Sequence, residues 1–387
     1  MTDAPAPARP GTVERLGQLD ALRVLGCLSV VTVHAIGAPF PADSVGLGEA
    51  SFLLHYSREI FFFVSALVLV RSSHPKVGPD GRLPDEDEFR RRRLRLIGVP
   101  YLWWTTLYGA VWLYRDLGGE QAFGSLVNDL PLRWLFLVVT GSGNYHMYFL
   151  LVSIQYGLAF PLVLRLLRRT EGRHGQLLIA SLALQVATLA VYHWGHLPEN
   201  GWRALLGDAS LPAYQFWLIA GAVAGVHVHR WHECAMRHRF WLLGAFPICA
   251  AVLTWTYFVQ VESRGAVGAS SPLQPIMIMW AVSVLGVLYL ASVRLVRRAS
   301  SPTRTLVGHG ARLSFGVYLA HPLVLDVVLA VLRRLDLVAP SAWVAFVVLL
   351  LTVGVTTAGC ALLQYSRFSP ALIGRPRIRR SAAQVPV

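Results

Sequence analysis

Long apolar stretches separated by short polar ones dominate the pattern of this 387-residue chain. A helix that crosses a bilayer needs about 20 mostly apolar residues, so we predict a membrane-spanning helix in each stretch. The ten predicted spans cover residues 19–38, 51–70, 96–114, 146–167, 177–194, 211–229, 240–260, 273–293, 312–332 and 342–365. The sequence therefore predicts an all-α integral membrane bundle of about ten transmembrane helices, which forms one domain over residues 19–366.

The positions of the basic residues predict how this bundle is oriented. The loops on one side carry few of the 35 Lys and Arg residues, namely Arg115, Arg133, Arg203, Arg264, Arg333 and Arg334. Most of the others lie in the N-terminal segment, in residues 71–95, 165–176, 230–239 and 294–312, and in the C-terminal tail. Because basic residues collect on the cytoplasmic side, we expect both termini to be cytoplasmic.

The segments outside the predicted spans contain little that could fold separately. Residues 1–18 are polar and rich in Pro and Ala, which predicts a disordered cytoplasmic segment, and residues 367–387 form a basic, poorly ordered cytoplasmic tail. The non-cytoplasmic loop 115–145 contains a short apolar piece, Trp134–Val139. This piece is too brief to span, so we expect it to be re-entrant or to lie in the membrane interface.

Composition and charge exclude several classes of protein. Only 14% of the residues are charged, against about 25% in a soluble domain. The net charge of +14 comes from short basic runs between apolar spans, a pattern that suits membrane lipids and not nucleic acid. The four cysteines show neither CxxC nor zinc spacing, so we expect no metal and no disulfide framework. We also expect no cleavable signal peptide, because the first apolar run is full-length and begins with charged residues.

The first span carries ionisable residues that a lipid-facing helix would avoid. Arg23 and His34 are eleven residues apart, close to three whole turns, so they share one helix face about 16 Å apart. In the predicted orientation Arg23 lies near the cytoplasm and His34 in the outer half of the membrane. Ionisable groups at this depth usually face a protein interior or a wet cavity, which predicts a polar track along this face. Alternatively, Arg23 reaches the lipid headgroups and His34 is a packing residue.

Span 2 and the loop after it hold two more candidate sites. Arg58 and Glu59 lie at a depth comparable to that of His34, and a nearby carboxylate would raise the basicity of the imidazole for general base catalysis. Alternatively, they form a structural ion pair. Residues 90–95 read RRRRLR on the cytoplasmic side, where arginine forks suit phosphate binding. A plain topology anchor is the other interpretation of this run.

Aromatic and histidine residues mark spans 4 and 9. At the outer end of span 4 lie Tyr145, His146 and Tyr148, which indicate an interfacial aromatic belt or a sugar-binding lip. In span 9, Tyr318 and His321 are i,i+3 neighbours on one helix face.

Five phrases of the sequence arrive in an order that resembles a known family. They are LDALR with His34 ten residues beyond it, FFFVSA in span 2, RRRLRLIGVPY before span 3, YHMYFL in span 4 and SFGVYLAHPLVL in span 9. Together they resemble the membrane acyltransferase 3 family, multi-pass enzymes that O-acylate cell-surface sugars and related acceptors. The phrases SREIFFFVSA and YLAHPLVLD, with residues 272–275, are similar to its intercellular adhesion protein C branch. The chain departs from the family at Ala66, where Gly is usual, and at Tyr148, where many members have Trp; both positions bear on acceptor fit.

The resemblance implies an O-acyltransferase that moves an acetyl- or succinyl-class group from cytoplasmic acyl-CoA to a glycan or other small hydroxylated acceptor at the cell surface. In this reaction His34 is the general base or carries the acyl group itself, assisted by Arg23 and Glu59. The expected ligands of the CoA phosphates are Arg23, Arg90, Arg92, Arg93 and Arg95. The expected acceptor-binding residues are Arg58, Ser65, His146, Tyr148, Tyr318 and His321.

The same resemblance implies a multi-pass protein of the bacterial inner or plasma membrane, associated with the polysaccharide synthesis machinery. Two other functions stay open at this stage, because a fold does not determine a function. One is a transporter or flippase that moves a lipid-linked sugar or glycan without acyl chemistry. The other is a pseudoenzyme that only scaffolds a glycosyltransferase.

Overall fold

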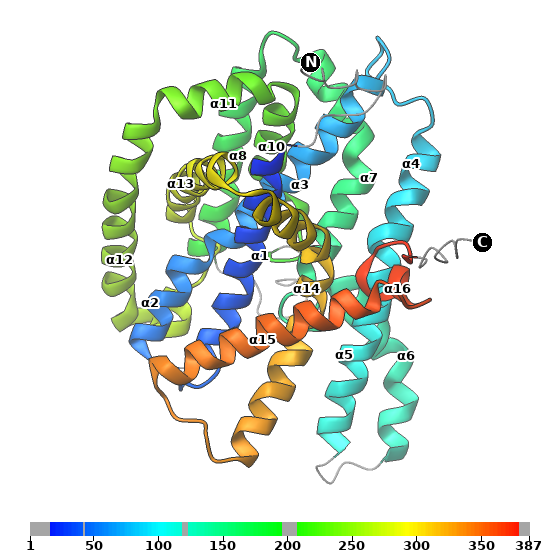
Figure 1. Cartoon of the computed structure of the whole chain (residues 1–387), viewed down its shortest axis with the longest axis vertical. Helices are drawn as coiled ribbons and strands as arrows, with labels where there is room; N and C mark the ends of the chain where they lie inside the picture. The colour runs from blue at the N-terminus through cyan, green and yellow to red at the C-terminus, as the bar shows by residue number, and fades with distance from the viewer. Residues whose placement is uncertain (1–15, 42, 118–122, 196–206, 379–387) are drawn as a thin grey trace, which may run out of the picture.

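The computed structural model describes residues 16–41, 43–117, 123–195 and 207–378, and within these ranges it is helical and contains no strand (Figure 1). The α-helices are α1 (Gly17–Gly37), α2 (Val45–Leu54), α3 (Tyr56–Ser73), α4 (Glu86–Arg93), α5 (Val99–Leu117), α6 (Phe123–Thr140), α7 (Tyr148–Arg169), α8 (His174–Trp194), α10 (Gln215–Val226), α11 (Val228–Arg237), α12 (Arg239–Ala269), α13 (Ile276–Arg298), α14 (Ser301–Arg334), α15 (Ala342–Leu363) and α16 (Ser369–Ile373). Short helical turns cover His74–Lys76, Leu94–Gly98 and Leu211–Tyr214.

The predicted all-α membrane bundle is confirmed, with fewer spans than the ten expected. In the described part of the chain, eight helices are long and apolar enough to cross a membrane. A ninth span is possible if Leu211–Val226 and Val228–Arg237, which meet at a bend of 101°, cross together. The predicted span 96–114 falls on α5, which does not reach this apolarity because Trp and Tyr residues and Arg115 lower its hydropathy.

Helix α5 instead packs against α6, and the two run side by side toward the same end of the molecule as the last turns of α14 (Figure 1). The short apolar piece Trp134–Val139 is part of α6, an 18-residue helix that packs on α5. The second predicted span falls on α2 and α3, which meet at His55 and together count as one of the eight candidate spans. Helix α1 lies in the middle of the bundle, in contact with α3, α13, α14 and α15 (Figure 1).

Helices α3 and α10 pack closely because α10 presents two glycines, four residues apart, to the backbone of α3. A Cβ atom at Gly221 would lie 2.1 Å from the carbonyl oxygen of Phe63, and one at Gly225 would lie 2.7 Å from that of Leu67. Small residues at this spacing let two membrane helices approach each other closely. The contact fixes α3, which carries Arg58, Glu59 and Ser65, against the core.

Part of the predicted C-terminal tail is folded onto the bundle. Helix α16 lies in this tail and contacts α5, α14 and α15. The indole Nε1 of Trp104 donates a hydrogen bond to the carbonyl oxygen of Leu372 at 2.8 Å. Gly374 follows with a φ of 60°, a left-handed conformation that glycine adopts without strain. The remainder of the tail, residues 379–387, and most of the predicted N-terminal segment lie outside the described residues, while α1 begins two residues earlier than its predicted span.

Candidate functional site

A cavity of about 280 Å³, which we call the histidine cavity, lies at the end of α1 that carries His34. Its wall comes from α1, α3, α7, α14 and three loops. The residues that line it are Val30, Val33, His34, His55, Ser57, Arg58, Phe61, Tyr145, His146, Tyr148, Phe149, Asp208, Pro272 and Tyr318. Four of the predicted site residues, Arg58, His146, Tyr148 and Tyr318, therefore share one wall with His34.

Three imidazole rings that are far apart in the sequence come together beside this cavity. The ring centroid of His34 lies 5.5 Å from that of His321, and the centroid of His146 lies 5.3 Å from that of His321. The phenol ring of Tyr145 is 4.3 Å from the imidazole of His34. The sequence analysis treated the three histidines as separate candidates, and in the folded protein they form one cluster. No group of His, Cys, Asp or Glu side chains in the described ranges is arranged to hold a metal ion.

The backbone around the cluster fixes one of these imidazoles. The Nδ1 atom of His321 lies 2.7 Å from the carbonyl oxygen of Tyr318. Because a carbonyl oxygen only accepts, Nδ1 carries the proton and Nε2 carries the lone pair. Nε2 of His321 and both ring nitrogens of His146 are buried and have no hydrogen-bond partner in the described structure. The cluster thus offers unpaired nitrogen atoms beside a cavity, which is typical of a site that handles protons or polar substrates.

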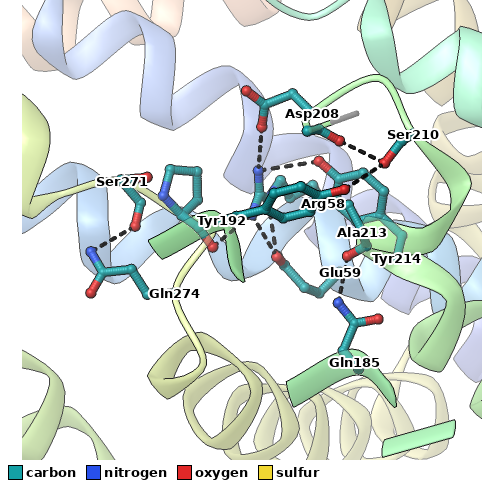
Figure 2. Close-up of polar contacts among 12 residues, drawn as sticks. Arg58, Glu59, Gln185, Tyr192, Asp208, Ser210, Ala213, Tyr214, Ser271 and Gln274 are labelled. Atoms are coloured by element: carbon teal, nitrogen blue, oxygen red, sulfur yellow. Dashed lines mark hydrogen bonds and ion pairs between the residues drawn. The ribbon is translucent and has the colours of Figure 1, made fainter. Parts of the chain in front are cut away.

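Arg58 organises the polar side of the histidine cavity (Figure 2). Its Nη2 donates to Glu59 Oε1 at 3.0 Å and to the carbonyl oxygen of Pro272 at 2.8 Å. Its Nη1 lies 3.4 Å from the hydroxyl of Tyr214 and 3.5 Å from Asp208 Oδ1. The guanidinium therefore ties α3 to two loops, and one end of it remains in the cavity wall.

Glu59 was expected to orient His34, and the structure places it elsewhere. Its described hydrogen bonds go to Arg58, and Glu59 does not line the histidine cavity. The alternative that the sequence left open, a structural pair with Arg58, matches this geometry. The second carboxylate oxygen, Oε2, is buried and has no hydrogen-bond partner in the described structure.

A second cavity of about 240 Å³, which we call the arginine cavity, lies toward the end of the bundle that carries α4. Arg23, Arg93 and Arg375 line it together with hydroxyl-bearing and apolar side chains. Burial lowers the pKa of Arg93 to about 10, although the Tyr156 hydroxyl opposes this shift. The like charges of Arg92 and Arg23 lower that pKa further. The guanidinium stays charged at neutral pH, so the cavity holds a concentration of positive charge suited to an anion.

The rest of the predicted arginine run does not line this cavity. Arg90 forms ion pairs with Glu86 at 3.6 Å and with Asp87 at 3.1 Å. Arg92 and Arg95 are exposed. Ser65, predicted as an acceptor ligand, lines the arginine cavity and not the histidine cavity.

Arg375 is a site residue that the sequence analysis missed, because it assigned this segment to the tail. Helix α16 brings it back to the bundle, where its Nε donates a hydrogen bond to the carbonyl oxygen of Arg312 at 3.2 Å. A Cβ atom at Gly374 would lie 2.6 Å from the ring of Phe315. The signal in the sequence was the apolar SPALIG phrase that precedes Arg375, which is typical of a short packed helix with a glycine at its end.

Two aromatic rings separate the cavities. Phe61 and Phe149 line both of them, and their ring centroids are 4.8 Å apart in an edge-to-face arrangement. Arg23 and His34 of α1 lie on opposite sides of this wall. The polar track predicted along α1 is therefore two cavities placed end to end.

Comparisons with known proteins identify the family of this chain. A family model described as "Acyltransferase domain" matches residues 16–364. The chain is 24% identical over 281 residues to the "Putative membrane-bound acyltransferase YfiQ" of Bacillus subtilis (strain 168), covering 70% of this chain and 72% of that protein. No solved structure matches the chain.

Proposed function

The chain belongs to the acyltransferase domain family and is a multi-pass membrane acyltransferase, and on that premise we propose the donor, the acceptor and the roles of the residues. The donor is acyl-CoA with a short acyl group of the acetyl or succinyl class. The acceptor is a hydroxyl of an exported glycan or a related small molecule. The single observation that carries this proposal is the pair of cavities, one rich in arginine and one rich in histidine, with a shared wall.

The arginine cavity suits the donor. Coenzyme A carries several phosphate groups, and arginine guanidinium groups bind phosphate through charge-assisted hydrogen bonds. Arg23, Arg93 and Arg375 approach this cavity from α1, α4 and the segment after α16, so a phosphate there would have donors on several sides. The charge pattern of the loops predicts that this end of the bundle is cytoplasmic, where acyl-CoA is present.

The histidine cavity suits the acceptor and the transfer. His34 takes the proton of the acceptor hydroxyl as its oxygen attacks the thioester carbonyl carbon, and the C–S bond then breaks. The proton passes from the imidazolium to the departing CoA thiolate, so an ester and free CoA are formed. His146 and Tyr145, beside His34, provide an N–H and an O–H that can stabilise the negative oxygen of the tetrahedral intermediate.

The size and polarity of the histidine cavity favour a sugar-like acceptor. A volume of about 280 Å³ is near the lower end for ligand pockets, so it accommodates about one sugar ring and not a folded oligosaccharide. Arg58, Asp208 and Tyr148 provide donors and acceptors for sugar hydroxyls. With the predicted orientation, this cavity opens toward the outside of the bacterial plasma membrane, where a polysaccharide synthesis complex would present such an acceptor.

The test is acyl transfer by the purified protein in proteoliposomes, with radiolabelled acetyl-CoA and succinyl-CoA and a glycan extract as acceptor. Wild-type protein should release CoA and label the glycan. His34→Ala should lose about 10²–10⁴-fold in turnover, the usual contribution of a general base. The matched control is His309→Ala, since His309 is exposed on α14 and away from both cavities.

Two results would contradict the proposal. Retention of more than about a tenth of the wild-type turnover by His34→Ala, less than the smallest effect expected of a base, would remove His34 from catalysis. Movement of the glycan across the membrane without CoA release would favour a transporter.

A further inference from the structure

We infer that the side chain of Phe61 is a movable partition between the two cavities, and that its size limits which acyl groups reach His34. The inference rests on the proposed function for the identity of what passes, while the partition itself follows from the geometry. Among the residues that line the two cavities, Phe61 and Phe149 alone are common to both. These rings therefore form the barrier that a thioester must pass.

One face of α3 leads from the first cavity to the second through Phe61. Arg58 lines the histidine cavity, Phe61 lines both, and Ser65 lines the arginine cavity. The spacings of three and four residues place these side chains on the same face of the helix, one above the other. Phe61 is therefore the bulky apolar side chain between two polar side chains on this face of α3.

The surroundings of the two rings indicate which of them moves. Phe149 is 4% exposed, and its ring packs against Phe62 at 4.4 Å and against Tyr318 at 5.1 Å as well as against Phe61. Phe61 is only half-buried, and its other ring contact, with Tyr318, is 5.8 Å between centroids. A side chain that borders empty space on two sides can change its χ1 rotamer with little repacking. Phe149 is thus the fixed part of the wall and Phe61 the mobile part.

A closed partition has a chemical purpose in the proposed reaction. If the cavities were joined permanently, water entering from the outer side would reach the thioester and hydrolyse it without an acceptor. With Phe61 in place, the thioester is exposed to the histidine cluster only when the ring rotates. A larger acyl group needs a larger opening, so the same ring selects for short acyl groups.

The test of the partition uses sidedness of thiol labelling and needs no acyltransfer. Ser65→Cys places a thiol in the arginine cavity, directly behind Phe61 on α3. The background carries Cys234→Ser and Cys249→Ser, because these are the cysteines that are not buried. A charged, membrane-impermeant maleimide is applied to right-side-out or inside-out vesicles. With Phe61 in place, we expect labelling from the arginine-cavity side to be much faster than labelling from the other side, because the ring blocks the reagent except when it rotates.

Phe61→Ala should allow labelling from both sides at comparable rates. The matched control is Phe63→Ala, which removes the same ring two residues further along α3, where it packs against Trp231 and lines neither cavity. That control should keep the unequal rates. Phe61→Leu, a smaller change, serves if Phe61→Ala does not fold, and it should give an intermediate rate.

Equal labelling rates from both sides with Phe61 intact, or strongly unequal rates in folded Phe61→Ala and Phe61→Leu proteins, overturn the partition. A second measurement concerns selection. Acyl-CoA hydrolysis without acceptor should rise in Phe61→Ala, and the preference for acetyl over hexanoyl groups should fall. If the labelling result holds and no acyl-CoA is consumed by any variant, the partition stands and the proposed donor is wrong.

Discussion

Arg93 offers the sharpest test of the proposed donor site, because a neighbouring arginine in the same run provides a matched control. Arg93 lines the arginine cavity at the end of α4, whereas Arg91, two residues earlier, is exposed and lines neither cavity. Both are arginines of one helix, and both add the same charge to the protein. We therefore expect Arg93→Ala to weaken acyl-CoA binding and Arg91→Ala to leave it unchanged.

The magnitude follows from the kind of contact that is lost. A hydrogen bond to a charged group contributes about 1.5–3 kcal/mol, and 1.4 kcal/mol corresponds to a factor of ten in an equilibrium constant. Loss of the Arg93 contact with one phosphate should therefore raise the KM for acyl-CoA about 10- to 150-fold. The kcat should change little, because the phosphate is bound equally in the ground state and in the transition state.

The thermal stability of the protein without ligand should change little in the same variant. Burial, with the like charges of Arg92 and Arg23, lowers the pKa of Arg93 to about 10, so its charged form is disfavoured in the folded protein. Removing this guanidinium relieves that cost but also removes its cation–π contact with the ring of Phe89, so Arg93→Ala without ligand should melt close to the wild type. Coenzyme A should raise the melting temperature of the wild type and of Arg91→Ala, and much less that of Arg93→Ala.

Steady-state kinetics and thermal unfolding in detergent measure both effects. An equal rise in KM for Arg91→Ala and Arg93→Ala would show that the run acts as a diffuse positive surface. An unchanged KM in both variants would show that residues 90–95 do not bind the donor and only help to determine the topology.

Three further predictions follow from other parts of the fold. Gly374→Ala should move Arg375 out of the arginine cavity and raise the KM for acyl-CoA, because the left-handed backbone costs a non-glycine residue about 1–2 kcal/mol. Gly221→Ala should separate α10 from α3 and cost about 1–3 kcal/mol of stability, measured by thermal unfolding. Thiols introduced by Ser142→Cys and Ser301→Cys, both at exposed positions, should react with impermeant maleimide from opposite sides of the membrane, with the second on the cytoplasmic side.

Matched controls make these outcomes specific. Gly359→Ala and Gly354→Ala add a Cβ atom on α15 where nothing lies within 4 Å, and neither should change KM or stability much. A wild-type KM in Gly374→Ala would show that Arg375 takes no part in donor binding. Full stability of Gly221→Ala would contradict the close packing of α3 and α10, and labelling of both thiols from one side would contradict the predicted topology.

The sequence predicted the spans well where hydrophobicity alone decides them, as in α1, α13 and α15. At α5 it predicted a helix that the structure contains but that is not among the helices apolar enough to cross a membrane, because aromatic rings with polar atoms favour an interface over the hydrocarbon core. The packing of α5 against α6 depends on tertiary contacts, which periodicity does not contain.

Within the candidate site, the sequence identified types of residue better than it identified partners. Arg23 and His34 lie on one helix, so their separation along α1 follows from helical periodicity. His146 and His321 come from other elements, and only the packing of α1 against α14 brings His34 to His321. Likewise, neither hydropathy nor charge distinguishes Arg93 from Arg92, because the difference is which way α4 turns its side chains.

The folded tail has a consequence for the order in which the protein becomes competent during synthesis. Arg375 reaches the arginine cavity only after α16 has emerged and docked beside α5 and α14. A chain still being inserted into the membrane already contains His34 and the rings of the partition, and it lacks one wall of the cavity opposite. The segment that follows the last span thus completes the arginine cavity, and a ribosome-bound intermediate that already holds the imidazole cluster still lacks one of the three arginines proposed to bind coenzyme A.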